Sequence, residues 1–160
     1  MAWYRAAVVI AVMADILRYN NKELTRRILA CNRVVKRWQG MPLIWGAWDC
    51  AHLCADMAVE LGFSNPMKYW PKYNSLLEAR KTLKKKGFET LTEAVTSKLK
   101  PIAIGELMPS DIVEIKSDIP KMNALGIWLA PDAVLVFGED KVQRVDMQHA
   151  TGKAWELTNA

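Results

Sequence analysis

Asp49 and Cys50 form a pair of adjacent residues whose types and position favour covalent chemistry. The segment after them carries an apolar stripe at three- and four-residue spacing, which predicts a helix. Its members are Cys50, Leu53, Cys54, Met57 and Leu61. Asp49 is a good N-cap, and Gly62 is a good helix stop. Free N–H groups and the helix dipole favour a thiolate in the first turn, so Cys50 is either a nucleophile or a well-packed small apolar residue.

A nucleophilic cysteine needs a proton acceptor, and the chain has two histidines, His52 and His149. His52 lies two residues after Cys50, and residues so spaced on a helix do not face each other. His149 follows the fourth predicted strand, which places it far from Cys50 unless the loop after Asp146 folds back across the sheet. A catalytic pair of Cys50 and His149 is therefore the one pairing left open.

The loop before Cys50 contains Trp45 and Trp48. These two aromatic side chains either wall a cleft beside the cysteine or cover the end of the hydrophobic core. The cysteines number three, with Cys50 and Cys54 one helical turn apart. This sparse, odd count predicts neither a disulfide framework nor a metal site, and no cofactor motif is present.

Two helices are predicted before this region. Residues 3–19 are apolar almost all the way round, which is typical of a helix buried in a core, a subunit interface or lipid. Residues 22–39 carry a regular apolar stripe, made of Leu24, Ile28, Cys31, Val35 and Trp38. Basic residues lie away from that stripe: Arg26, Arg27, Arg33, Lys36 and Arg37. Such a face is most often solvated, and binding of phosphate or lipid is the alternative.

Further helices are predicted over residues 76–86 and 90–99, and the pattern then changes to short alternating segments. Strands are expected at 111–115, 124–129, 133–137 and 141–146, with a last edge strand at 155–157. Helices followed by an antiparallel meander make an α+β fold. We expect a helical hairpin extension over 1–38 and one α+β domain over 39–160.

The length of 160 residues suits one domain with its own core, and the net charge of +5 suits an acidic partner. Residues 6–14 form an apolar run that is too short to span a bilayer and is closed by Asp15. We therefore expect no targeting or transmembrane segment.

Three motifs, in order, resemble the NlpC-type peptidoglycan peptidases of the papain-like superfamily. The residues 45–50, Trp-Gly-Ala-Trp-Asp-Cys, are similar to the Trp-Gly-Gly…Asp-Cys-Ser-Gly signature of that family. Residues 109–113, Pro-Ser-Asp-Ile-Val, resemble its Pro-Gly-Asp-Leu-Val strand, and residues 124–129, Ala-Leu-Gly-Ile-Trp-Leu, resemble its His-Val-Gly-Ile-Tyr-Leu strand. The resemblance covers about residues 41–145 and is closest to a phage-encoded branch.

This resemblance implies a papain-like fold in which Cys50 is the nucleophile and backbone amides hold the oxyanion. The family histidine would begin the second strand, but this chain has Ala124 there. The third polar residue of the family falls near Leu135 or Val136, which are apolar.

Two functions remain open. One is a degenerate NlpC-like pseudoenzyme that serves as an accessory protein of a phage tail or ejection machinery. It would be made in the host cytoplasm, would be associated with the virion and would contact other virion proteins through residues 1–38. The other is an active cysteine amidase that cleaves peptidoglycan stem peptides. Nucleic-acid binding by the basic helix 22–38 is a third hypothesis without a recognition motif.

Overall fold

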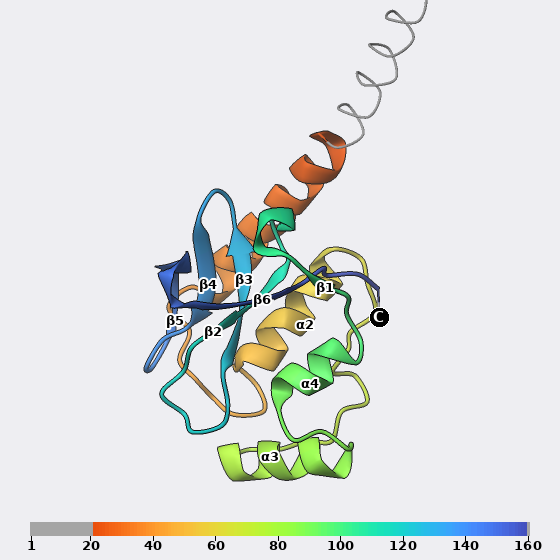
Figure 1. Ribbon diagram of the computed structural model, residues 1–160, viewed down its shortest axis with the longest axis vertical. Helices are drawn as coiled ribbons and strands as arrows, with labels where there is room; N and C mark the ends of the chain where they lie inside the picture. Colours follow the sequence, from red (N-terminus) through yellow and green to blue (C-terminus); the bar gives the residue numbers. More distant parts are fainter. Residues whose placement is uncertain (1–20, 160) are drawn as a thin grey trace, which may run out of the picture.

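The computed structural model describes residues 21–159, in which helices precede an antiparallel sheet (Figure 1). A first helix covers residues 21–38. The other helices are α2 (Cys50–Glu60), α3 (Leu76–Lys85) and α4 (Leu91–Thr96), with short 3-10 turns η1 (Ile104–Glu106) and η2 (Met147–His149). The strands are β1 (Pro101–Ile102), β2 (Ile112–Ile115), β3 (Ala124–Leu129), β4 (Ala133–Phe137), β5 (Val142–Asp146) and β6 (Ala150–Trp155). The predicted α+β fold class is confirmed.

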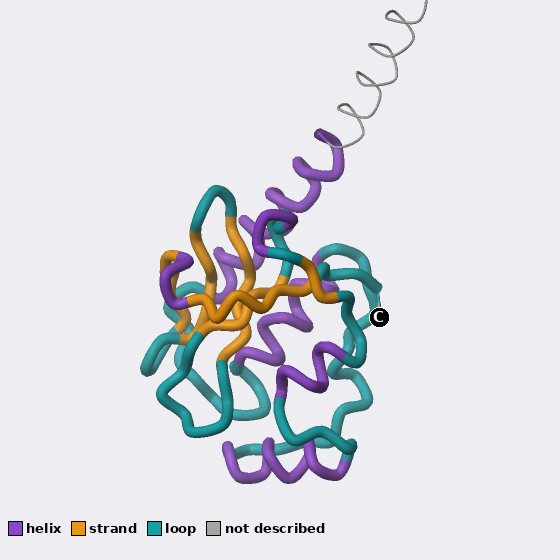
Figure 2. The backbone as a smooth tube through the Cα atoms, in the orientation of Figure 1, coloured by secondary structure: helices purple, strands orange, loops and turns teal. Residues whose placement is uncertain are grey.

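The six strands pair in the order β1-β6-β2-β3-β4-β5, and every pairing is antiparallel. Strands β2 to β5 form the predicted meander. The expectation of an edge strand at 155–157 was wrong, because β6 covers Ala150–Trp155 and lies inside the sheet between β1 and β2 (Figure 2). The chain reaches this place through η2, which carries it from β5 at one edge back across the sheet.

Side chains on the two faces of the sheet form two separate clusters. One face packs against α2 and the helix of residues 21–38, and α2 lies against β3. Ile127, Leu135 and Val142 are its most buried strand residues. The opposite face carries a smaller cluster around Val113 and Val134. Because residues alternate along a strand, each strand residue belongs to one face only.

The helix of residues 21–38 belongs to the main core. Its buried apolar residues are Ala30, Cys31, Val34, Val35 and Trp38, and they pack with residues of α2 and the sheet. The predicted stripe is correct over its second half and wrong over its first, because Leu24 and Ile28 are 36% and 38% exposed while Arg27 is buried. The first half of the predicted hairpin lies outside the described residues, and the boundary at residue 38 stays a prediction.

Ion pairs join this helix to α2. Arg37 lies 2.9 Å from Asp56 and 2.7 Å from Glu60, and Arg33 also pairs with Glu60. Two residues of the predicted basic face, Arg33 and Arg37, are therefore paired with carboxylates of the neighbouring helix. Within residues 21–159, no helix combines the length and the apolar character needed to cross a bilayer.

Candidate functional site

Asp49 caps α2 as predicted, and Cys50 occupies the first helical position. The Asp49 carboxylate accepts a hydrogen bond from the His52 main-chain N–H at 3.0 Å. Its backbone is extended, which is typical of an N-cap. The helix thus places Cys50 toward the protein body, with Leu53 and Met57 fully buried below it.

The Asp49 carboxylate is enclosed by donors and is only 1% exposed. It contacts Nδ1 of His52 at 2.7 Å and accepts hydrogen bonds from the Tyr73 hydroxyl at 2.7 Å and the Gly46 N–H at 2.9 Å. Burial alone would raise the pKa of Asp49, but these hydrogen bonds outweigh it and hold the pKa below its ordinary value. The same carboxylate raises the pKa of Tyr73 further, after burial has raised it.

The Cys50 thiol is held in its neutral form. Burial raises the pKa of Cys50 to about 11, and the negative charge of Asp49 adds to the rise. A main-chain hydrogen bond with Leu125 opposes these effects without overcoming them. Cys54 and Cys31 are buried thiols whose pKa values are also raised by burial, the latter to about 11, as suits packing residues. The helix dipole therefore does not produce the thiolate that its N-terminus favours.

Cys50 lies on a pocket of about 670 Å³ between α2, the loop of residues 64–73, α3 and α4. The pocket also reaches the sheet at Leu125 and Ile112. Trp45 lines it. Trp48 instead packs in the core, where its ring centroid lies 4.6 Å from that of Trp38 at an interplanar angle of 61°.

The structure does not bring a histidine to the thiol. His52 is bound to Asp49, and among the described residues that line the pocket there is no histidine. The chain does fold back after Asp146, so that Ile115 pairs with both Ala150 and Ala124. His149 nevertheless lies exposed on η2. Its catalytic role remains a prediction.

The positions that the family resemblance assigns to catalysis carry apolar side chains. Ala124 begins β3 and packs with the cluster on the face away from α2. Leu135 and Val136 are buried in β4, one on each face. None of these side chains can accept or orient a proton.

Sequence analysis missed Glu114, a carboxylate that is 2% exposed at the centre of β2. It is the register partner of Leu125 and accepts hydrogen bonds from Thr151 at 2.7 Å and from Thr92. The sequence around Glu114 predicts a strand but gives no sign that Thr92 of α4 contacts this carboxylate. Within residues 21–159 no three His, Cys, Asp or Glu side chains are arranged to hold a metal ion.

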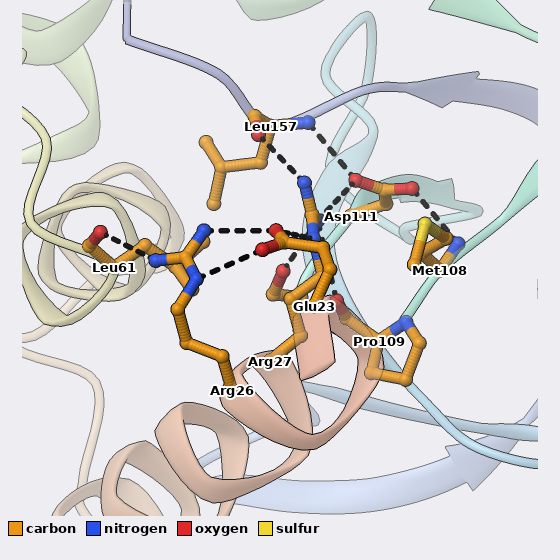
Figure 3. A network of polar contacts seen from close by, with 9 residues as sticks. Glu23, Arg26, Arg27, Leu61, Met108, Pro109, Asp111 and Leu157 are labelled. Atoms are coloured by element: carbon orange, nitrogen blue, oxygen red, sulfur yellow. Dashed lines mark hydrogen bonds and ion pairs between the residues drawn. The ribbon is translucent and has the colours of Figure 1, made fainter. Parts of the chain in front are cut away.

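A buried polar network fixes the turn that leads into β2 (Figure 3). Arg27 donates to the Ser110 hydroxyl at 2.8 Å and to the Asp111 carboxylate at 3.1 Å. Asp111 also accepts from the main-chain N–H groups of Met108 and Leu157. The expectation that Arg27 is solvated was wrong, because it is the internal counter-ion of Asp111.

Ser110 stands where the resembling motif has glycine, and it adopts a φ of 84°. Few residues other than glycine take this left-handed conformation. The hydrogen bond that the Ser110 hydroxyl accepts from Arg27 offsets the energetic cost of this backbone conformation.

Residues 23–157 match the model of a protein family described as a domain of unknown function (DUF6950). The chain belongs to this family. The match includes the helix that carries Arg27 and ends two residues after β6, so it spans both the core helices and the whole sheet. Comparison with curated proteins gives no match.

Solved structures of NlpC/P60 proteins share the fold of this DUF6950 domain. A lipoprotein-like NLP/P60 protein of Staphylococcus aureus aligns with a TM-score of 0.57 at 14% identity, over 84% of this chain and 42% of its own. The chain thus spans less than half of that protein. The P60 domain of an antigen from M. avium paratuberculosis gives 0.53 at 12% identity, over 84% of this chain and 97% of its own.

A third relative is RipD of Mycobacterium tuberculosis, described as a non-catalytic NlpC/p60 domain protein adapted to peptidoglycan binding. It aligns with a TM-score of 0.50 at 12% identity, over 81% of this chain and 98% of its own. These likenesses confirm the NlpC-like fold that the three sequence motifs indicated.

Gly46 lets the loop before α2 pass close to Tyr73. Its φ is +83°, and a Cβ added there would lie 1.8 Å from the Tyr73 carbonyl oxygen. We expect Gly46→Ala to lower the free energy of unfolding by more than roughly 2 kcal/mol, from the left-handed backbone and the displaced Tyr73 segment together. Chemical denaturation would measure this loss.

Gly87→Ala is the matched control. Its φ is +88°, but a Cβ there meets nothing within 4 Å, so only the backbone cost of about 1 kcal/mol applies. Equal losses in the two variants would show that the contact with Tyr73 does not constrain the loop.

Tyr73→Phe tests the hydrogen bonds that hold Asp49. We expect the free energy of unfolding at pH 7 to fall by about 1.5–3 kcal/mol, because a hydrogen bond to a buried carboxylate is lost. The pKa of Asp49 is lower in the folded protein than in the unfolded chain, so its ionised carboxylate stabilises the fold at every pH above the unfolded-state pKa. This stabilisation is lost as the pH falls through the folded-state pKa. The difference between the two proteins should therefore shrink in strong acid, where Asp49 is protonated in both.

Unfolding curves recorded from pH 7 down to acid would test this dependence, with Tyr69→Phe as the control because Tyr69 is 83% exposed. A difference between wild type and Tyr73→Phe that does not change with pH would contradict the role given to Asp49.

Proposed function

We propose that this chain is a catalytically degenerate NlpC-like domain that acts as an accessory protein of a phage particle. The proposed loss of catalysis rests on the protonation state and surroundings of the Cys50 thiol. The nucleophile position is retained at the start of α2, but the thiol has a raised pKa and none of the described residues that line its pocket is a histidine. Without a base, neither deprotonation of the thiol nor protonation of a leaving amine is assisted.

The neighbour RipD supports a non-catalytic role, since it is described as having kept this fold while adapting to peptidoglycan binding. The phage assignment rests on the sequence resemblance to a phage-encoded branch. Contacts with other virion proteins through residues 1–38, and with peptidoglycan, belong to this proposal. Nucleic-acid binding has less support, because Arg27, Arg33 and Arg37 are paired with carboxylates.

Purified peptidoglycan tests the catalytic part. Incubation with wild-type protein should release no soluble peptides, as should Cys50→Ser, while cosedimentation would report binding of the intact protein. Peptide release that is abolished in Cys50→Ser and in His149→Ala would overturn the proposal and establish an active cysteine amidase.

Mass spectrometry of purified phage particles tests the virion part. The chain should be present at a constant copy number, and its absence from particles would refute that assignment.

A further inference from the structure

The pocket beside Cys50 is lined mainly by apolar side chains. Aromatic and aliphatic residues from the loop, α3, α4 and β3 surround it, among them Trp45, Trp70, Phe88, Leu91, Val95 and Leu125. Its volume of about 670 Å³ is in the range of sites that enclose a small-molecule ligand. Such a lining favours an aliphatic or aromatic group and disfavours a charged peptide, whose polar groups would lose their water without gaining partners.

The pocket carries a buried negative charge and two exposed positive charges. Among the described lining residues, the acidic side chain is Asp49, which is fully occupied by its four hydrogen bonds. The basic ones are Lys68 and Lys98, which are exposed and take part in no ion pair within residues 21–159. The apolar floor is thus combined with a cationic rim.

Two aromatic residues extend this arrangement at the mouth. The Tyr69 side chain lines the pocket although it is 83% exposed, and Lys68 Nζ lies 5.2 Å from its ring centroid. Lys86 Nζ lies 6.0 Å from the ring centroid of Trp70, another lining residue. An exposed aromatic side chain beside lysines suits a ligand that is apolar next to an anionic group.

We propose that this pocket binds a single-chain anionic amphiphile. Its aliphatic chain fills the space between α2, α3 and α4, and its carboxylate or phosphate head lies at Lys68 and Lys98. Binding is non-covalent and does not require Cys50 to react. The inference is therefore independent of the proposed function, and a failure of either leaves the other standing.

Calorimetry with monomeric dodecanoate, below the concentration at which it forms micelles, is the direct test. One molecule should bind per chain. Decanoate and octanoate should bind progressively more weakly, by about fourfold for each methylene that leaves the pocket. Dodecyl phosphate should bind comparably if the head group is recognised by charge alone, and more weakly if the site is built for a carboxylate. Dodecanol should bind more weakly than dodecanoate, by up to about thirtyfold, because contacts with two exposed lysines contribute at most about 1 kcal/mol each.

Charge reversal tests the rim. Lys68→Glu/Lys98→Glu should weaken dodecanoate binding by at least about tenfold. Lys116→Glu/Lys141→Glu is the matched control, because both lysines are exposed and neither lines the pocket.

Ala94→Trp tests the interior, since Ala94 is a half-buried lining residue of α4. Binding should be lost while the thermal midpoint and circular dichroism stay near those of the exposed-site control Ala103→Trp. If Ala94→Trp does not fold, the lysine variants still decide the matter.

Any of four results would overturn the proposal. Three come from calorimetry: no saturable binding of dodecanoate, dodecanol binding as tight as that of dodecanoate, or a loss of affinity in the control lysine pair as large as that in the rim pair. The fourth is binding to anionic phospholipid vesicles without binding to monomeric dodecanoate. In that case the lysines would recognise a membrane surface, and no ligand would occupy the pocket.

Discussion

Cys50 will react with iodoacetamide at neutral pH at least about tenfold more slowly than an ordinary cysteine thiol. A rise of its pKa from 9.0 to about 11 leaves about 100-fold less thiolate, and the greater nucleophilicity of a more basic thiolate recovers only part of that loss. The rate should keep rising with pH beyond pH 9 without reaching a plateau. A catalytic cysteine paired with histidine would instead be labelled rapidly near pH 6.

Mass spectrometry of the labelled peptides would separate Cys50 from Cys31 and Cys54, which are more deeply buried. His149→Ala should leave the pH profile unchanged, and Cys50→Ser should remove the label. Fast labelling in weak acid that is slowed by His149→Ala would contradict this prediction and show that His149 accepts the proton of Cys50.

Arg27→Met should lower the free energy of unfolding by about 3–5 kcal/mol, because it leaves the Asp111 carboxylate buried without its counter-ion. The methionine side chain fills similar space, so the loss reports the charge more than the volume. The turn at Ser110 would also lose the hydrogen bond that compensates its left-handed backbone.

Arg33→Met is the matched control on the same helix. Arg33 is half exposed and pairs with Glu60 at the surface, where an ion pair contributes at most about 1 kcal/mol. Denaturant unfolding of both variants at pH 7 would measure the contrast. A loss below 1 kcal/mol in Arg27→Met would mean that Asp111 is satisfied by the main-chain donors of Met108 and Leu157 alone.

The helix that carries Cys50 could be predicted because its signals are local. Asp49 at the cap, Gly62 past the end and the stripe between them lie within fourteen consecutive residues, and the structure reproduces all three. Strands 124–129 and 133–137 were predicted to the residue for the same reason, since turn residues at 130–132 and 138–140 follow them directly.

The features that sequence analysis missed depend on distant partners. The apolar stripe along residues 21–38 does not show which part of the helix is covered by other elements. Leu24 and Ile28 were therefore assigned to the core and Arg27 to the surface, whereas the structure shows the opposite. Glu114 gave no sign of burial, because its partners Thr92 and Thr151 lie on α4 and β6.

The central position of β6 has a consequence for synthesis on the ribosome. β1 and β2 each pair with β6, which is made last of all the strands. While residues 150–155 are still inside the exit tunnel, the meander from β2 to β5 has an unpaired edge at β2, and β1 has no partner. Such an edge is prone to pair with another chain. Nascent chains of this protein should therefore depend on chaperones until the final strand emerges, and a ribosome stalled before residue 150 should carry a chain that is readily digested by protease.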